Sequence, residues 1–184
     1  MNVKGIAVRA TYNYVKDKYP ERFAEWLNSL PHNSKKIFTN QILPSEWYPA
    51  YDAVIVPTKL IGTMFLGTPE KAADEVGRYS AREALKGVYK IFARLSSINY
   101  IIKRSVSIYS NYWDTGKFTI ISNEKGNSMM RLSEIPDDFY LVIHRVAGWI
   151  FEIPLIMKKN LKKYELKKVQ RGRYIDGYFY IEWE

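Results

Sequence analysis

The stretch Tyr112-Trp113-Asp114-Thr115-Gly116-Lys117-Phe118-Thr119-Ile120-Ile121-Ser122 separates two kinds of sequence in this chain of 184 residues. Before it, apolar residues recur at every third or fourth position, which is typical of amphipathic helices. After it, short apolar runs are separated by clusters of turn residues, as in strands joined by hairpins. The change of spacing at Gly116 therefore predicts a helical N-terminal part followed by an antiparallel sheet.

The part before Gly116 contains four long segments with helical spacing. Pro20 lies inside the first of them and is expected to restart the helix, and Pro57 is expected to kink or interrupt the second. Between these two lies a shorter amphipathic segment, and Ser45 after Pro44 predicts the N-cap of a helix. The four predicted helices span residues 9–30, 51–66, 69–95 and 98–112.

The helix over residues 69–95 has the clearest start. Thr68-Pro69-Glu70 provides a cap, a first-turn proline and an acid at the positive end of the helix dipole. Small residues then recur along one stripe, which lets a second backbone approach closely. We therefore expect this to be the central, most tightly packed helix, with a stripe made of Ala73, Gly77, Ala81, Ala84 and Val88.

The part after Gly116 consists of two predicted hairpins with an apolar helix between them. Helices on one face of an antiparallel sheet bury both sets of apolar surfaces. The fold class is therefore α+β, with an N-terminal helical layer packed on an antiparallel sheet built from two C-terminal hairpins separated by a helix. The absence of repeats and linkers predicts a single domain over residues 1–184. The predicted elements are strands 117–122 and 128–133, a helix 137–154, and strands 164–170 and 174–183.

The composition limits the chemistry that this chain can perform. It contains no cysteine, which excludes disulfides, thiolate metal sites and a cysteine nucleophile. Only His32 and His144 can supply an imidazole, and no Gly-x-Ser-x-Gly elbow or glycine-rich phosphate loop is present. Asp137 and Asp138 are interpreted as residues of a helix start. These observations predict a protein that is not an enzyme.

The sequence also bears on location. Residues 1–8 lack an apolar run of signal-peptide length, and no uninterrupted apolar stretch is long enough to span a membrane. We therefore expect a cytoplasmic protein without a transmembrane segment.

Most of the formal net charge of +9 lies in residues 158–173, where eight basic residues face one acid, Glu165. Three interpretations are open: an edge strand protected by lysines, a nucleic-acid contact in which Tyr174, Tyr178 and Phe179 stack on bases, or a contact with an anionic membrane or acidic partner. The lysines occur in adjacent pairs, so they are expected on both faces of the sheet. The candidate anion-contact residues are Lys158, Lys159, Lys162, Lys163, Lys167, Lys168, Arg171 and Arg173.

Aromatic residues make up 15% of the chain and suit either a packed core or a ligand pocket. Apolar walls with a few hydroxyl and indole donors are what a small-molecule pocket requires. The candidates to line such a pocket, between the small-residue helix and the sheet, are Tyr79, Tyr89, Phe92, Tyr109, Trp113, Trp149 and Phe151. The competing interpretation places each of them in a filled core.

The order of elements and a few local patterns resemble a known superfamily. It contains the 4-vinyl reductase domains, the haem nitric-oxide-binding domains and the small subunits of the TRAPP tethering complex. Within it the chain is most similar to the uncharacterised bacterial DUF2378 group. The patterns that carry the resemblance are Val3-Lys4-Gly5, Trp47-Tyr48-Pro49, Val76-Gly77-Arg78-Tyr79, residues 112–116 and Gly148.

The resemblance implies a domain that senses a small apolar ligand or assembles with a regulatory partner, with a homodimer formed through the helical layer. Haem-binding relatives are marked by a proximal histidine on a helix and a Tyr-x-Ser-x-Arg motif. Here Tyr79-Ser80-Ala81-Arg82 has a different spacing, and neither histidine lies between this motif and the first hairpin. Because haem needs an axial donor, we expect no haem and no other cofactor.

Overall fold

The structure of the chain is a computed structural model that describes residues 1–86 and 97–184. Its N-terminal part is helical, as predicted. The first predicted helix is divided at Pro20, where a short 3₁₀ turn separates α1 from α2, so the expected restart is confirmed. The helices of this part are α1 (Gly5–Lys18), α2 (Phe23–Ser29), α3 (His32–Thr39), α4 (Val56–Ile61), α5 (Pro69–Lys86) and α7 (Ile98–Tyr112).

The prediction that Ser45 caps a helix is wrong. The chain turns at Ser45 and then forms a short strand, β2 (Trp47–Pro49), which pairs antiparallel with β1 (Asn2–Lys4). Strands of three residues are too short to show an alternating pattern, which is why neither was expected. The predicted helix that follows is formed by α4 with a π-helical segment on each side. Pro57 lies where the first π-helical segment gives way to α4, so its missing N–H interrupts the regular hydrogen bonding there.

Two C-terminal hairpins form one antiparallel sheet in the order β3-β4-β6-β5. The two hairpins join through β4 and β6, where Met130 lies opposite Phe179. Between the hairpins the chain forms α8 (Leu141–Ile156), as expected. The α+β class predicted from the sequence is therefore confirmed, and its strands are β3 (Lys117–Glu124), β4 (Asn127–Pro136), β5 (Leu161–Arg171) and β6 (Tyr174–Trp183).

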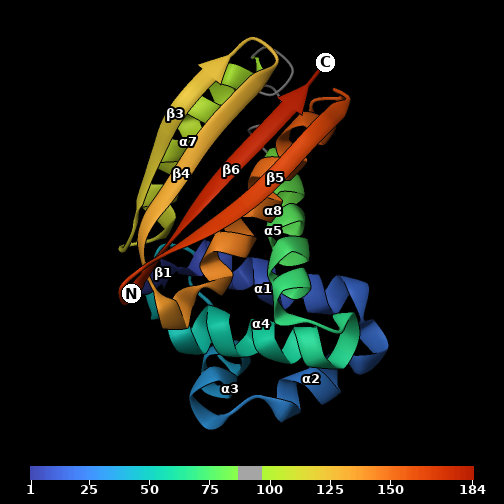
Figure 1. Cartoon of the computed structure of the whole chain (residues 1–184). Coiled ribbons are helices and arrows are strands. Elements are labelled where there is room, and N and C mark those ends of the chain that lie inside the picture. The colour runs from blue at the N-terminus through green and yellow to red at the C-terminus, as the bar shows by residue number, and fades with distance from the viewer. Residues whose placement is uncertain (87–96) are drawn as a thin grey trace.

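The sheet packs on α7 and α8, with α7 behind β3 and β4 and α8 behind β5 and β6 (Figure 1). Helix α5 lies against α8, and α1 to α4 form a layer at one end of the molecule (Figure 1). Among the described residues, only Asp137–Ile156 is long and apolar enough to cross a membrane by length and composition. Most of this stretch is buried inside the structure, against α5 and the sheet.

Helices α5 and α8 cross at backbone contact distance. A Cβ atom added at Gly77 of α5 would lie 2.1 Å from the carbonyl oxygen of Arg145 in α8. In the reverse direction, a Cβ atom at Gly148 of α8 would lie 2.1 Å from the carbonyl oxygen of Asp74. The expectation that the small-residue stripe lets a second backbone approach closely is therefore confirmed at Gly77.

Sequence patterns that lie far apart along the chain meet at the start of the sheet. Val3 of β1 forms a bridge with Trp113, and both backbone and side-chain amides of Asn2 donate hydrogen bonds to the carboxylate of Asp114. Gly116 follows with φ near 88°, a conformation that favours glycine. The N-terminal strand thus fixes the point at which the helices give way to the sheet.

Gly77→Ala tests the backbone contact between α5 and α8. Alanine favours an isolated helix over glycine by about 1 kcal/mol, so helix propensity alone predicts a more stable protein. Because the new methyl group would meet the α8 backbone, we expect instead a loss of about 2–3 kcal/mol in the free energy of unfolding. Urea unfolding measures it.

The matched control is Lys71→Ala, which changes an exposed residue of the same helix. It should change the free energy of unfolding by no more than about 0.5 kcal/mol. A Gly77→Ala protein as stable as the parent would mean that the two helices do not cross this closely.

Candidate functional site

A cavity of about 320 Å³ lies between α1, α5, α7, α8 and the first residues of β3. This volume is at the lower end of the range for small-molecule pockets. The walls are mainly apolar, with a few hydroxyl, amide and charged groups. The wall includes Ala7, Arg9 and Ala10 from α1, Glu83 from α5, Ser105 and Ile108 from α7, Phe118 from β3, and Arg145, Val146 and Ile150 from α8.

Four of the seven residues predicted to line a pocket lie in the wall of this cavity. They come from different elements: Tyr79 from α5, Tyr109 from α7, Trp149 from α8, and Trp113 from the segment before the sheet.

The other three predicted residues are not among the described wall residues. Phe151 packs against Tyr164 of β5, with 4.9 Å between the ring centroids, so it lies on the sheet side of α8. Tyr89 and Phe92 lie outside the described residues.

The hydroxyl groups of Tyr79 and Tyr109 in the cavity wall are held in place by hydrogen bonds. Tyr109 donates to the carbonyl oxygen of Thr115 at 2.6 Å, and Tyr79 donates to the carboxylate of Asp17 at 2.5 Å. Burial raises the pKa of both phenols, and the carboxylate that accepts from Tyr79 raises the pKa of that phenol further. Both are therefore neutral donors at physiological pH.

Arg145 is the functional candidate that the sequence analysis did not identify. This residue is part of the cavity wall and is 5% exposed, and its guanidinium donates to the hydroxyl of Thr11 at 2.8 Å and to the carbonyl oxygen of Ala7 at 2.6 Å. Burial lowers the pKa of Arg145 to about 10, so it stays charged at neutral pH. A buried charge without an opposite charge destabilises a fold by several kcal/mol.

A signal for Arg145 was nevertheless present in the sequence. Val142, Arg145, Val146 and Trp149 recur at helical spacing, which places the arginine on the apolar stripe of its helix. A charged residue on such a stripe needs a polar partner inside the protein.

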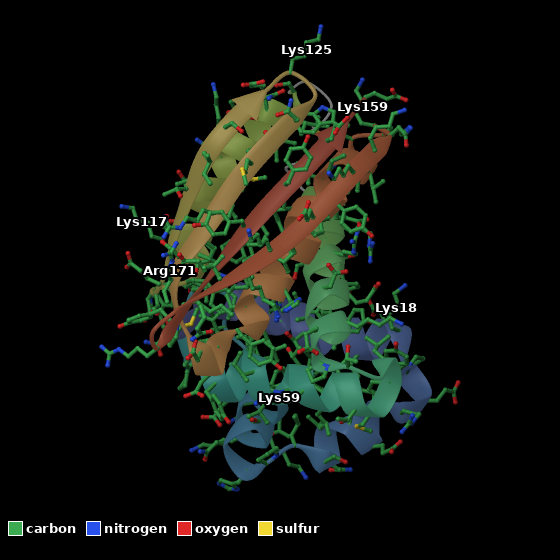
Figure 2. The ribbon with its side chains drawn as sticks, in the orientation of Figure 1. Lys18, Lys59, Lys117, Lys125, Lys159 and Arg171 are labelled. Atoms are coloured by element: carbon green, nitrogen blue, oxygen red, sulfur yellow. The ribbon has the colours of Figure 1, made fainter. Side chains whose placement is uncertain are left out.

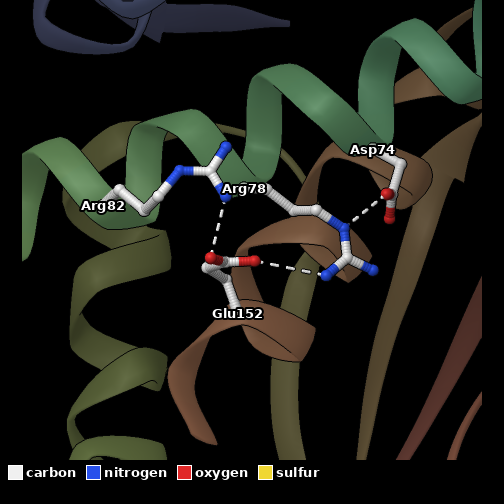
Figure 3. Close-up of polar contacts among 4 residues, drawn as sticks. All are labelled: Asp74, Arg78, Arg82 and Glu152. Atoms are coloured by element: carbon white, nitrogen blue, oxygen red, sulfur yellow. Dashed lines mark hydrogen bonds and ion pairs between the residues drawn. The ribbon is translucent and has the colours of Figure 1, made fainter. Parts of the chain in front are cut away.

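Two other arginines near α8 form ion pairs with carboxylates of the protein. Arg78 contacts the carboxylates of both Asp74 and Glu152, and Arg82 contacts Glu152 at 2.8 Å (Figure 3). Burial alone would lower the pKa of Arg78, but these two carboxylates raise it. Two arginines from α5 thus share two carboxylates, whereas no described carboxylate lies within ion-pair distance of Arg145.

Neither histidine lies in the cavity wall. His32 is exposed on α3, and the ring of His144 lies 3.0 Å from the amine of Lys168 on the sheet side of α8. Burial and the charge of Lys168 lower the pKa of His144. The cavity therefore has neither histidine nor cysteine to act as an axial haem donor, and the phenols of Tyr79 and Tyr109 are already hydrogen bonded.

The basic segment follows the edge of the sheet over its whole length. Lys159 and Arg171 lie at opposite ends of β5 (Figure 2). Its basic residues face both sides, as expected: Lys168 points to α8, whereas Lys163 lies over the ring of Tyr180 on the other face.

On this outer face the side chains of β5 and β6 border a shallow groove. Arg131 and Arg171 at one end both contact the buried carboxylate of Asp176. Lys158, Lys159, Lys162 and Arg173 lie outside the groove, and Lys162 pairs with Glu184 at 2.6 Å. The groove, called the outer groove below, is lined by Met129, Lys163, Glu165, Lys167, Val169, Arg171, Tyr178 and Tyr180.

Comparison with known proteins identifies the class of fold. No family model matches the sequence, and no curated protein matches it either. Solved structures do match over nearly the whole chain, and they are H-NOX domains. The chain therefore has an H-NOX-like fold, which confirms the haem nitric-oxide-binding branch of the predicted resemblance at the level of architecture.

Three of these structures illustrate the likeness. A point variant of Tt H-NOX matches with a TM-score of 0.76 and 15% identity, covering 98% of this chain and 95% of the other. An oxygen-binding H-NOX domain related to soluble guanylate cyclases matches with a TM-score of 0.75 and 12% identity, at the same coverage. An Fe(II) unliganded H-NOX protein from K. algicida has a TM-score of 0.73 and 11% identity, with coverage of 98% and 96%.

Tyr109 predicts how stability depends on alkaline pH. Above about pH 10 the unfolded chain loses its phenolic protons, while buried Tyr109 keeps its own, so the free energy of unfolding falls as the pH rises. Tyr109→Phe should make this fall less steep by up to about 1.4 kcal/mol per pH unit, measured by urea unfolding between about pH 10 and 11.

Tyr100→Phe, at an exposed position of the same helix, is the control and should leave the slope unchanged. An identical slope for Tyr109→Phe and the parent would show that Tyr109 is not buried as described.

Proposed function

We propose that this chain is a non-enzymatic domain that binds a small, mainly apolar molecule in the cavity between α1, α5, α7 and α8, and that it senses this molecule without haem. The observation that carries the proposal is the cavity itself, which brings together aromatic and aliphatic walls with a few fixed donors. Such a combination is typical of ligand pockets.

The H-NOX-like fold supports this proposal, since one of the matching structures is described as oxygen binding. The donor set argues against haem in this chain: Ser105, Ile108, Tyr109 and Tyr112 are the α7 residues of the cavity wall, and none is a histidine or cysteine. In our proposal the ligand therefore supplies its own apolar surface, and the protein provides shape and hydrogen bonds.

Three further predictions from the sequence agree with a sensing role: membership of the DUF2378 group, a cytoplasmic location, and assembly as a homodimer or with a regulatory partner. Each stays a prediction.

Ala10→Phe tests whether the cavity retains a ligand. Ala10 lies in the wall, so a phenyl ring at this position should fill part of the cavity and exclude the molecule. We expect native mass spectrometry of the purified parent to show a bound small molecule, and its occupancy to fall at least about ten-fold in Ala10→Phe, which requires a loss of at least about 1.4 kcal/mol in binding free energy.

Ala24→Phe makes the same change at an exposed position of α2 and should keep the parent's occupancy. Stoichiometric haem in the parent protein would contradict the proposal, and so would equal occupancy in Ala10→Phe and Ala24→Phe.

A second candidate function is nucleic-acid binding by the outer groove. Tyr178 and Tyr180 lie beside Lys163 and Lys167 there, which combines stacking surfaces with positive charge. Glu165 and the carboxylate of Asp176 offset part of this charge, so the groove favours nucleic acid less than the basic composition of β5 suggests.

This candidate predicts salt-sensitive binding of single-stranded oligonucleotides. Affinity should fall on the order of ten-fold between 50 and 200 mM salt, because a few phosphate contacts release counterions. Fluorescence anisotropy with DNA and RNA measures it, with Lys163→Ala as the groove variant and Lys159→Ala as the control outside the groove. An absence of binding to both nucleic acids at low salt would remove this candidate.

A further inference from the structure

We propose that the ligand of the cavity is a monoanion, an apolar or aromatic carboxylic acid, and that Arg145 is the residue that binds its carboxylate. This inference rests on the proposed function, because it names the chemical class of the molecule in the same cavity. It adds that the ligand carries one negative charge, which the shape of the cavity alone does not indicate.

The guanidinium of Arg145 has no opposite charge among the described residues. It is the most deeply buried arginine described, and the only polar partners described for its guanidinium are a hydroxyl and a backbone carbonyl oxygen, both neutral. Arg78 and Arg131, which are more exposed, each contact carboxylates of the protein itself. An anion in the cavity would give Arg145 the counter-charge that the other two find within the chain.

Both the backbone and the guanidinium of Arg145 are fixed by neighbouring helices. The carbonyl oxygen of Arg145 lies against Gly77, so the backbone that carries the side chain is fixed by the crossing of α5 and α8. The two hydrogen bonds to α1 then hold the guanidinium plane. A guanidinium has five N–H donors, and these two bonds use two of them. Such a pre-organised donor suits the two oxygens of a carboxylate.

Among the described wall residues Arg9, Glu83 and Arg145 carry a charge, and of these only Arg145 is buried. A single carboxylate matches this one buried charge, whereas a dianion such as a phosphate monoester would leave an unpaired negative charge beside apolar walls. Val146, Trp149, Ile150 and Phe118 leave the rest of the space apolar, which fits the body of an aromatic or aliphatic acid.

Matched pairs of acids and amides test the inference with the full chain. The probes are benzoate, 2-naphthoate, indole-3-acetate and decanoate, each paired with its neutral primary amide of nearly the same shape. Isothermal titration calorimetry measures each affinity after bound molecules have been removed by partial unfolding and refolding. We expect at least one acid to bind about ten-fold or more tightly than its amide, because only the acid can pair with the buried guanidinium.

Arg145→Met should abolish this preference while keeping the affinity for the amide. Since replacing a buried charge by an apolar residue is often tolerated, the variant is expected to fold. Arg145→Lys retains the charge without the planar fork and should retain part of the preference, which keeps the test valid if Arg145→Met does not fold. Arg104→Met, at an exposed position of α7, is the control and should behave as the parent.

The outcomes separate the two proposals. Tight binding of an acid over its amide, lost in Arg145→Met or weakened in Arg145→Lys, supports the inference. Equal binding of acid and amide, or a preference that survives in Arg145→Met, overturns the role of Arg145 and leaves the proposed function standing. Binding of neither member of any pair, together with an empty cavity in mass spectrometry, overturns the proposed function and the inference with it.

Discussion

The structure depends on one contact, the crossing of α5 and α8 at Gly77 and Gly148. Each glycine faces a carbonyl oxygen of the other helix, so the two backbones touch with no side chain between them. This crossing holds α8 under the sheet and directs one of its faces toward α1 and α7. The cavity is the space that these helices enclose, and its position therefore follows from two residues that have no side chain.

The same crossing explains why α8 has two kinds of charged environment. Toward α5, Glu152 is paired with Arg78 and Arg82, and these groups stabilise the helix pair through mutual neutralisation (Figure 3). Toward the cavity, Arg145 is held by Thr11 and Ala7 without a carboxylate among the described residues. The helix thus combines a structural ion cluster with one buried charge, which we propose pairs with a ligand.

The sequence predicted the class of fold and much of the element order, because long periodic segments and turn residues are local signals. The stripe that contains Gly77 predicted the tight helix, and Gly116 predicted the start of the sheet. The strands β1 and β2 were missed because their pairing joins residues 2–4 to 47–49 through contacts that no local pattern records. The aromatic residues indicated a pocket, but which of them share a wall depends on how four helices cross, and Phe151 faces the sheet instead. Arg145 was visible only as a charge on an apolar stripe.

A crystal structure of the protein purified from cells would show whether the cavity is a ligand site with Arg145 in its wall. We expect electron density for a small molecule between Tyr109 and Trp149, with two oxygen atoms within hydrogen-bond distance of the guanidinium. A closed core in which these aromatic side chains fill the space would contradict it, as would a haem group coordinated by a cavity side chain.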